Sequence, residues 1–168
     1  MAEITEMSAE TTVTDSAKKA RLYTLKLLTH RDRTERDLRL KLKDALYSDE
    51  DIEQAVNYVK DFGYLDDTRY AFNYIRMSSG RLGRTQLKQK LSEKGVASEN
   101  IEEAFRQASE EGFIDENTEY ELIEKLLRKK HMDLGAIDKA DRDKLYASFY
   151  RKGFAVADVE KVLRSFLT

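Results

Sequence analysis

The stretch LRLKLKDALYSDEDIEQAVNYVKDFGYLD, residues 38–66, decides the fold because it recurs further along the chain. Residues 87–115 read LKQKLSEKGVASENIEEAFRQASEEGFID, and a shift of 49 residues (87 minus 38) aligns the two stretches without a gap. A further shift of 58 residues (145 minus 87) brings part of the same apolar pattern onto residues 145–163. Three copies of one unit predict a repeat protein, and such proteins commonly bind other macromolecules along an extended surface.

Each copy carries the spacing of an amphipathic helix. Ile52, Ala55, Val56 and Val59 follow the pattern i, i+3, i+4, i+7, which places them on one face of a helix that ends near Gly63. The chain contains no proline, so nothing in its 168 residues forbids helix. We predict an all-α protein of tandem three-helix repeats, with helices capped by four side chains: Thr34, Ser48, Asp66 and Ser98.

The repeat also predicts the domain boundaries. Residues 1–16 are polar and acidic and are predicted to form a disordered tail. The three repeats are then expected at residues 17–63, 64–112 and 113–168. A unit of about 49 residues lies near the lower limit for independent folding, so neighbouring repeats must pack on one another. We expect the apolar residues that follow the closing glycines to form these inter-repeat contacts: Tyr64, Leu65, Phe113 and Ile114.

Composition argues against several classes of site. The absence of cysteine excludes disulfides, thiol nucleophiles and cysteine metal ligands, and is compatible with a reducing cytoplasm. No apolar stretch approaches the length of a membrane span, so we expect a cytoplasmic protein with no membrane contact. His30 and His131 have no second ligand at metal spacing, and no phosphate-binding loop is present. We therefore predict no catalytic residue, no cofactor and no metal, and an enzyme is the function class least favoured.

Charge alternates along the chain in step with the repeat. Residues 17–48 hold ten basic and four acidic residues, whereas residues 49–67 hold one basic and seven acidic residues. Residues 69–94 hold seven basic residues and one acidic residue, and residues 99–124 hold one basic and ten acidic residues. A basic stripe repeated in this way suits a polyanion, but the same residues could simply solvate exposed helix faces, and charge alone does not decide between the two. The candidate contact residues are Arg31, Arg33, Arg36, Arg39, Lys41, Lys43, Arg76, Arg81, Arg84, Lys88, Lys90 and Lys94.

Three segments resemble the RecX family, regulators of the bacterial RecA recombinase. They are ARLYTLKLLTHRDRTERDLRLKL (residues 20–42), FGYLDDTRYAFNYI (residues 62–75) and GRLGRTQLKQKLSEKGV (residues 80–96). The resemblance extends over roughly residues 17–168, and its central segments are the most specific. It implies an elongated, curved array of three-helix repeats that lies in the groove of the filament RecA forms on single-stranded DNA. It brings no catalytic residues with it.

Our main hypothesis is a regulatory protein that binds RecA–single-stranded DNA filaments as a monomer. It would modulate, most often inhibit, their ATPase, strand-exchange and co-protease activities, as the resemblance implies. The alternatives are a helical module that binds DNA directly, which predicts a steep dependence of affinity on salt, and a helical scaffold for another protein. The net charge of −2 speaks against independent tight binding to DNA.

Overall fold

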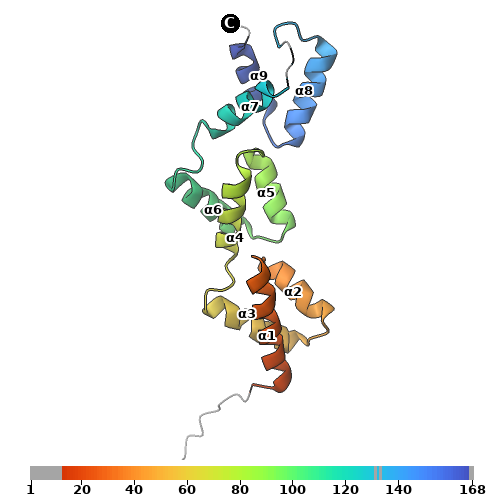
Figure 1. Ribbon diagram of the computed structural model, residues 1–168, viewed down its shortest axis with the longest axis vertical. Helices are drawn as coiled ribbons and strands as arrows, with labels where there is room; N and C mark the ends of the chain where they lie inside the picture. Colours follow the sequence, from red (N-terminus) through yellow and green to blue (C-terminus); the bar gives the residue numbers. More distant parts are fainter. Residues whose placement is uncertain (1–12, 131, 133, 167–168) are drawn as a thin grey trace, which may run out of the picture. The chain divides into compact units, whose positions relative to one another are not determined.

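The computed structural model describes residues 13–130, 132 and 134–166, and this part of the chain is all helical, with no strand (Figure 1). The all-α prediction is therefore confirmed for these residues. The helices are α1 (Asp15–His30), α2 (Glu35–Asp44), α3 (Asp49–Asp61), α4 (Asp67–Ser78), α5 (Arg84–Glu93), α6 (Ser98–Glu110), α7 (Thr118–Arg128), α8 (Lys139–Arg151) and α9 (Val156–Ser165).

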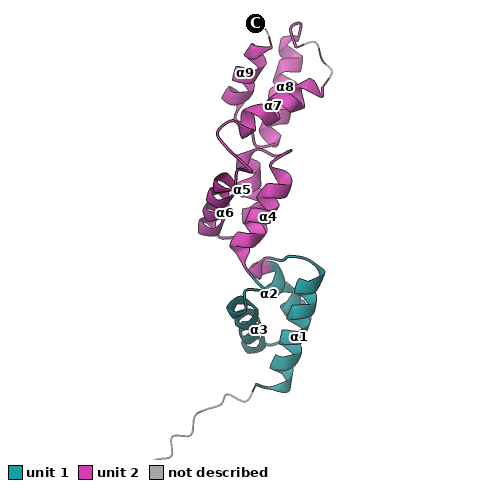
Figure 2. Ribbon diagram, turned by 60° about the vertical axis from the view of Figure 1, so that its left-hand side comes forward, with its two compact units in different colours: residues 1–33, 37–65 teal, residues 34–36, 66–168 magenta. Residues whose placement is uncertain are grey.

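The chain divides into two compact units (Figure 2). Unit 1 comprises residues 1–33 and 37–65, of which residues 13 onward are described. Unit 2 comprises residues 34–36 and 66–168. The boundary after residue 65 lies close to the repeat boundary that we predict after residue 63, and helices α4 to α9 belong to a single unit.

Unit 1 has one hydrophobic core, built from α1, α2 and α3. The core contains Leu38 and Leu42 from α2, both fully buried, and the four-residue stripe of α3 that the sequence predicts. Helix α1 begins at Asp15, two residues before the start that we expect at Ala17, because the Thr14 hydroxyl accepts a hydrogen bond from the Ala17 amide. Residues 1–12 of the predicted tail lie outside the described residues.

Two of the four predicted N-caps are confirmed, and the one at Thr34 stays a prediction. The Ser48 hydroxyl accepts a hydrogen bond from the Asp51 amide at 3.2 Å, and the Asp66 carboxylate accepts one from the Arg69 amide at 3.0 Å. The prediction for Ser98 is wrong: the capping position is Ala97, which has no side-chain acceptor, and Ser98 is the first residue of α6. The helix therefore starts without a side-chain cap.

The Ser48 cap gives a testable stability effect. We expect Ser48→Ala to lower the free energy of unfolding of unit 1 by about 1 kcal/mol, because the Asp51 amide loses its acceptor. Chemical denaturation followed by circular dichroism measures the change, and Ser98→Ala is the control at a serine that caps nothing. An equal effect of the two substitutions would contradict the capping role of Ser48.

Unit 2 has two hydrophobic cores that meet at a close backbone contact. One core is built from α4, α5 and α6, and the other from α7, α8 and α9. Between them, the Gly83 amide donates to the Lys152 carbonyl at 2.9 Å, and the Gln86 side-chain amide donates to the Arg151 carbonyl at 2.7 Å. The start of α5 therefore rests against the end of α8.

Several helices of the described chain end in the same way. Gly63, Gly95, Gly112 and Gly153 all have φ between 70° and 85°, the left-handed conformation in which helices commonly end. The predicted termination of helices at these glycines is confirmed. Leu46, at the end of α2, has the same conformation with φ 63°, and it is the one residue other than glycine with a positive φ in the described chain.

Candidate interaction surface

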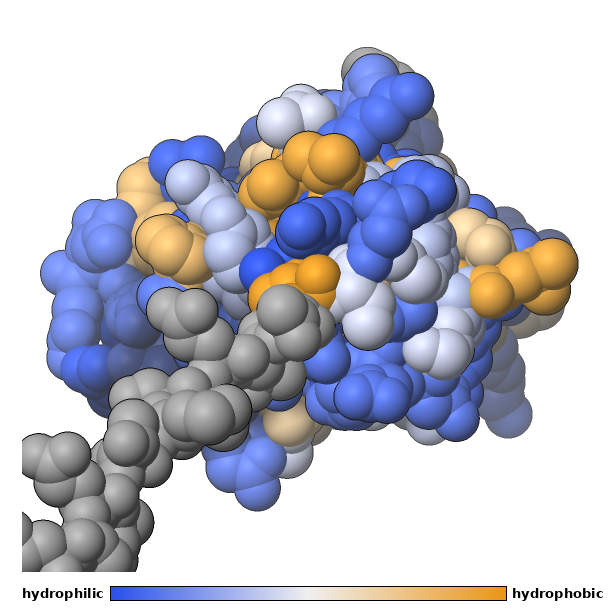
Figure 3. Space-filling model, turned by 90° about the horizontal axis from the view of Figure 1, so that it is seen from below, coloured by the Kyte–Doolittle hydropathy of each residue, from blue (hydrophilic) through white to orange (hydrophobic). Residues whose placement is uncertain are grey.

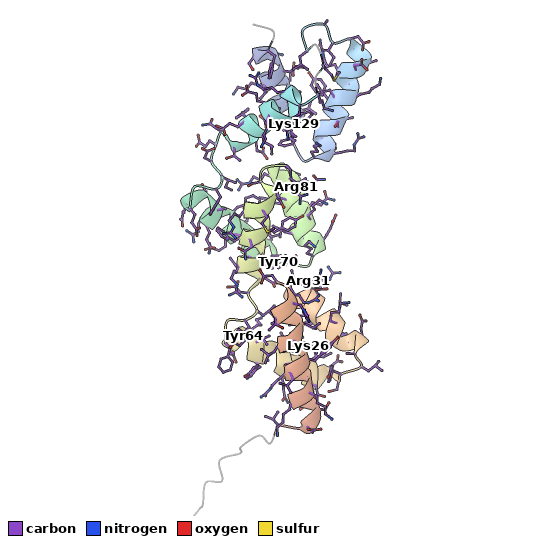
Figure 4. All side chains as sticks on the ribbon, in the orientation of Figure 1. Lys26, Arg31, Tyr64, Tyr70, Arg81 and Lys129 are labelled. Atoms are coloured by element: carbon purple, nitrogen blue, oxygen red, sulfur yellow. The ribbon has the colours of Figure 1, made fainter. Side chains whose placement is uncertain are left out.

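The predicted contact residues of the first repeat differ in whether they already form ion pairs within the protein. Arg33 is structural: its guanidinium pairs with Asp37 at 2.5 Å and its side chain is only 9% exposed. Arg39 forms a two-point contact with Glu53, at 2.5 and 3.2 Å. Lys43 lies 4.0 Å from Asp49 and remains largely exposed. Among the described residues, Arg31 and Lys41 form no ion pair, and Arg31 is exposed (Figure 4).

In unit 2, two basic residues of α5 contact the same acidic side chain and the same aromatic ring. Arg84 lies 3.9 Å from Glu102, and Lys88 forms a hydrogen-bonded ion pair with the same carboxylate. Both cations also lie over the Phe105 ring, at 4.6 and 5.7 Å from its centroid. The hydrogen bond from Lys88 lowers the pKa of Glu102, and the charges of Lys88 and Arg84 act in the same direction. Glu102 therefore stays ionised at neutral pH.

The remaining predicted cations of unit 2 are more available. Arg76 lies near the rings of Phe72 and Phe113, at 6.0 and 5.8 Å, and Lys94 lies 5.9 Å from the Tyr74 ring. A cation over an aromatic ring keeps most of its charge available to an anion. Three further cations form no ion pair in the part of the chain that the structure describes: Arg36, which lies against Gly95, the exposed Arg81 (Figure 4), and the half-buried Lys90.

The two repeats use the same internal ion pair. Arg39 and Glu53 are separated by 14 residues, as are Lys88 and Glu102, and the shift of 49 residues places one pair on the other. Each pair joins the second helix of its repeat to the third. The sequence already contained this signal, because a basic residue 14 positions before an acidic one recurs at the repeat distance. These two cations are thus partly neutralised by the protein itself.

The residues predicted to pack between repeats lie in different surroundings. Leu65 is buried, at 5% exposure, in the core of α1 to α3. Tyr64 is 53% exposed, stacks on Phe62 and points away from the helices (Figure 4). Phe113 is 42% exposed and meets Phe72 edge to face, and Ile114 packs against the core of α4 to α6. A role of these four residues between repeats stays a prediction.

A pocket of unit 2 is too small for an ordinary ligand. It lies where Leu82, Phe105 and Ile114 face Thr118 and Leu122, and its volume is about 40 Å³. Pockets for small molecules are typically about 300–1,000 Å³. The backbone amide of Arg84 donates to the Glu119 carboxylate beside it, so the charged groups at its rim are satisfied by the protein.

Two other kinds of site are absent from the described residues. No three His, Cys, Asp or Glu side chains of this part of the chain come together as metal ligands, and His131 lies outside the described residues. No helix of the described chain has the length and apolar character needed to cross a membrane. What the described residues offer is a set of exposed and half-buried cations on the helices and in the turns between them.

Comparison with known proteins identifies relatives over most of the chain. The sequence profile of the first three-helix domain of RecX matches residues 20–58, and that of the second three-helix domain matches residues 66–104. The regulatory protein RecX of Vibrio vulnificus is 31% identical over 140 residues, which cover 83% of this chain and 87% of the relative. The regulatory protein RecX of Actinobacillus pleuropneumoniae serotype 5b is 35% identical over 137 residues, with 79% and 86% covered.

Solved structures share the fold. The crystal structure of RecX from Lactobacillus salivarius superimposes with a TM-score of 0.77 at 21% identity, covering 90% of this chain and 97% of that one. A second crystal structure, of a regulatory protein RecX, gives a TM-score of 0.73 at 24% identity, with coverage of 88% and 71%. At this level of identity the likeness extends to the fold.

Proposed function

Because the chain belongs to the RecX family, whose members are named as regulatory proteins, we propose that it binds RecA–single-stranded DNA filaments and inhibits them. The inhibited activities are the ATPase, strand exchange and co-protease functions of the filament. The protein acts as a cytoplasmic monomer, without catalysis of its own and without a cofactor. The resemblance of its sequence motifs to the family and the distribution of its exposed cations support this proposal.

The architecture that we propose for this role is an elongated, curved array of three repeats, at residues 17–63, 64–112 and 113–168. Its support is that each set of three consecutive helices has a hydrophobic core of its own. An array of this kind offers many weak contacts at a fixed spacing. Linked contacts add to a useful affinity where each alone is too weak, provided that their geometry matches the target.

The main support for the proposal is a set of basic residues that have no partner side chain in the part of the protein that the structure describes. Five members of the predicted contact set have neither an ion pair nor an aromatic ring as partner within the described chain: Arg31, Arg36, Lys41, Arg81 and Lys90. Cations without an internal carboxylate partner can neutralise phosphates of a nucleic acid or carboxylates of a protein without first breaking a pair. They are therefore the residues whose loss should matter most for binding to a DNA-bearing filament.

The test is a fourfold charge reversal. We expect the combined substitutions Arg36→Glu, Lys41→Glu, Arg81→Glu and Lys90→Glu to weaken filament binding about 100-fold or more, since each reversal replaces an attraction by a repulsion. The matched control reverses four exposed cations outside the predicted set, at Lys18, Lys129, Lys139 and Arg142, and changes the net charge equally. Filament ATP turnover and the anisotropy of a labelled protein are the measurements.

The outcomes separate the proposal from direct DNA binding. Unchanged inhibition of ATP turnover by the first variant, with helicity intact, would remove these cations from the mechanism. If both variants lose affinity equally, net charge and not position controls binding. If bare single-stranded DNA is bound as tightly as the filament, with a steep salt dependence, the protein is a DNA-binding module.

A further inference from the structure

Leu46 has a left-handed backbone conformation, and glycine occupies the equivalent position in the other two repeats. Its φ is 63°, whereas the residues at the equivalent positions, Gly95 and Gly153, have φ of 85° and 84°. The hydrogen bonds agree as well: the Leu46 amide donates to the Lys43 carbonyl, and the next amide, of Tyr47, donates to Leu42. The same two bonds close α5 at Gly95 and α8 at Gly153. The three turns are thus one structure with a different residue at its centre.

A leucine is disfavoured at this position for two reasons. Its Cβ atom is crowded by the backbone when φ is positive, which is why glycine and asparagine predominate there. Its side chain is also 91% exposed, so it gains almost nothing from burial within the protein. A lone exposed leucine is ordinary. A leucine that is both exposed and held in the left-handed conformation has no stabilising role in the isolated chain.

The surroundings of Leu46 indicate what it contacts. Three exposed carboxylates lie within four residues of it, at Asp44, Asp49 and Glu50, against the single cation Lys43. Carboxylates repel the phosphates of a nucleic acid, so the turn is unsuited to a DNA backbone. An aliphatic side chain flanked along the chain by acids is complementary to an apolar pocket with basic residues at its rim, which is a protein surface.

In α2 and the turn that follows it, two large apolar side chains are exposed, those of Leu40 and Leu46. Leu40, on α2, is 51% exposed, and the face of the molecule seen in Figure 3 is mainly hydrophilic with small separate apolar groups. A single projecting side chain is better suited to insertion into a pocket than to a flat hydrophobic contact. Because the left-handed turn fixes the backbone that carries the side chain, binding costs little backbone freedom.

We propose that Leu46 is a preformed anchor that inserts into an apolar, basic-rimmed pocket of a partner protein. If the proposed function holds, on which this identification rests, the partner is a recombinase subunit of the filament. The anchor then provides a protein contact separate from the cations assigned to the DNA-bearing filament. It also explains why a residue that strains the turn is present where glycine would relieve it.

The test compares stability and binding in the same variants. Leu46→Gly and Leu46→Asn remove the anchor and suit the left-handed conformation, so we expect the melting temperature to rise by up to about 2–4 °C. For the same two variants, we expect the affinity for a recombinase filament to fall about 10-fold or more, because the apolar side chain is lost. Leu46→Met keeps the apolar bulk and should bind within about 3-fold of wild type. Leu22→Ala, at a leucine of α1 that is 67% exposed, is the control and should change neither quantity.

Each result decides a different point. A Leu46→Gly protein that binds the filament as wild type does would overturn the anchor. An equal loss of affinity for bare single-stranded DNA would assign Leu46 to the nucleic acid instead of a protein. A wild-type protein that does not bind the filament at all would overturn the proposed function, and with it the recombinase subunit as the partner of Leu46.

Discussion

Leu65→Asp is expected to unfold the three-helix core of unit 1. The Leu65 side chain is 5% exposed and packs with apolar residues of α1, α2 and α3, so an aspartate there would place a carboxylate inside an apolar core. A buried uncompensated charge lowers the free energy of unfolding by about 3–5 kcal/mol. For a unit of this size, that is most of the stability available.

Hydrogen exchange can locate this effect. Amides of α1 and α3 should lose protection in Leu65→Asp, whereas amides of α7 and α9 should exchange as in wild type. Two controls carry the same charge at neighbouring or equivalent positions. Tyr64→Asp should be nearly neutral because Tyr64 is 53% exposed, and Ile114→Asp should cost only about 1–2 kcal/mol because Ile114 is half-buried. Equal losses for Leu65→Asp and Tyr64→Asp would contradict the burial described for Leu65.

Local features of the fold were predictable because they depend on neighbouring residues. Ser48 with the acids that follow it, the stripe of Ile52 and Val56, and the closing Gly63 together determine where α3 begins, which face it buries and where it ends. The prediction for Ser98 was wrong because serine is acceptable both as a cap and as a first helical residue, and Ala97 occupies the capping position. The residue types near the start of a helix therefore predict its first residue only to within about one position.

The candidate site was only partly predictable, because the sequence records charges but not their partners. Arg33 and Arg31 are equivalent on composition, yet Arg33 is 9% exposed and bound to Asp37 while Arg31 is exposed. Tyr64 and Leu65 are adjacent and apolar, yet one is exposed and the other is buried. Burial and pairing depend on how helices distant in sequence meet, which a periodic pattern does not specify.

Gly153→Ala should damage the contact between the end of α8 and the start of α5 in unit 2. A Cβ atom at Gly153 would lie 2.6 Å from the Cβ of Gln86, closer than real Cβ atoms approach other atoms, and the residue has φ of 84°. The substitution therefore combines backbone strain with overpacking, and we expect a loss of about 2–4 kcal/mol in the stability of unit 2. Gly83→Ala, whose Cβ would lie 2.6 Å from the Gly153 carbonyl oxygen, tests the same contact from the other side.

Gly112→Ala separates the effect of backbone strain from the effect of overpacking. Gly112 has φ of 76°, but a Cβ atom added there would meet no other atom within 4 Å, so alanine should cost only the strain, about 1 kcal/mol. The excess loss in Gly153→Ala over Gly112→Ala then measures how closely the two cores of unit 2 approach. Thermal unfolding and hydrogen exchange at α5 and α8 provide the readout. If alanine is tolerated equally at the two glycines, α5 and α8 do not touch as the structure describes, and the two cores of unit 2 are joined only by their connecting segment.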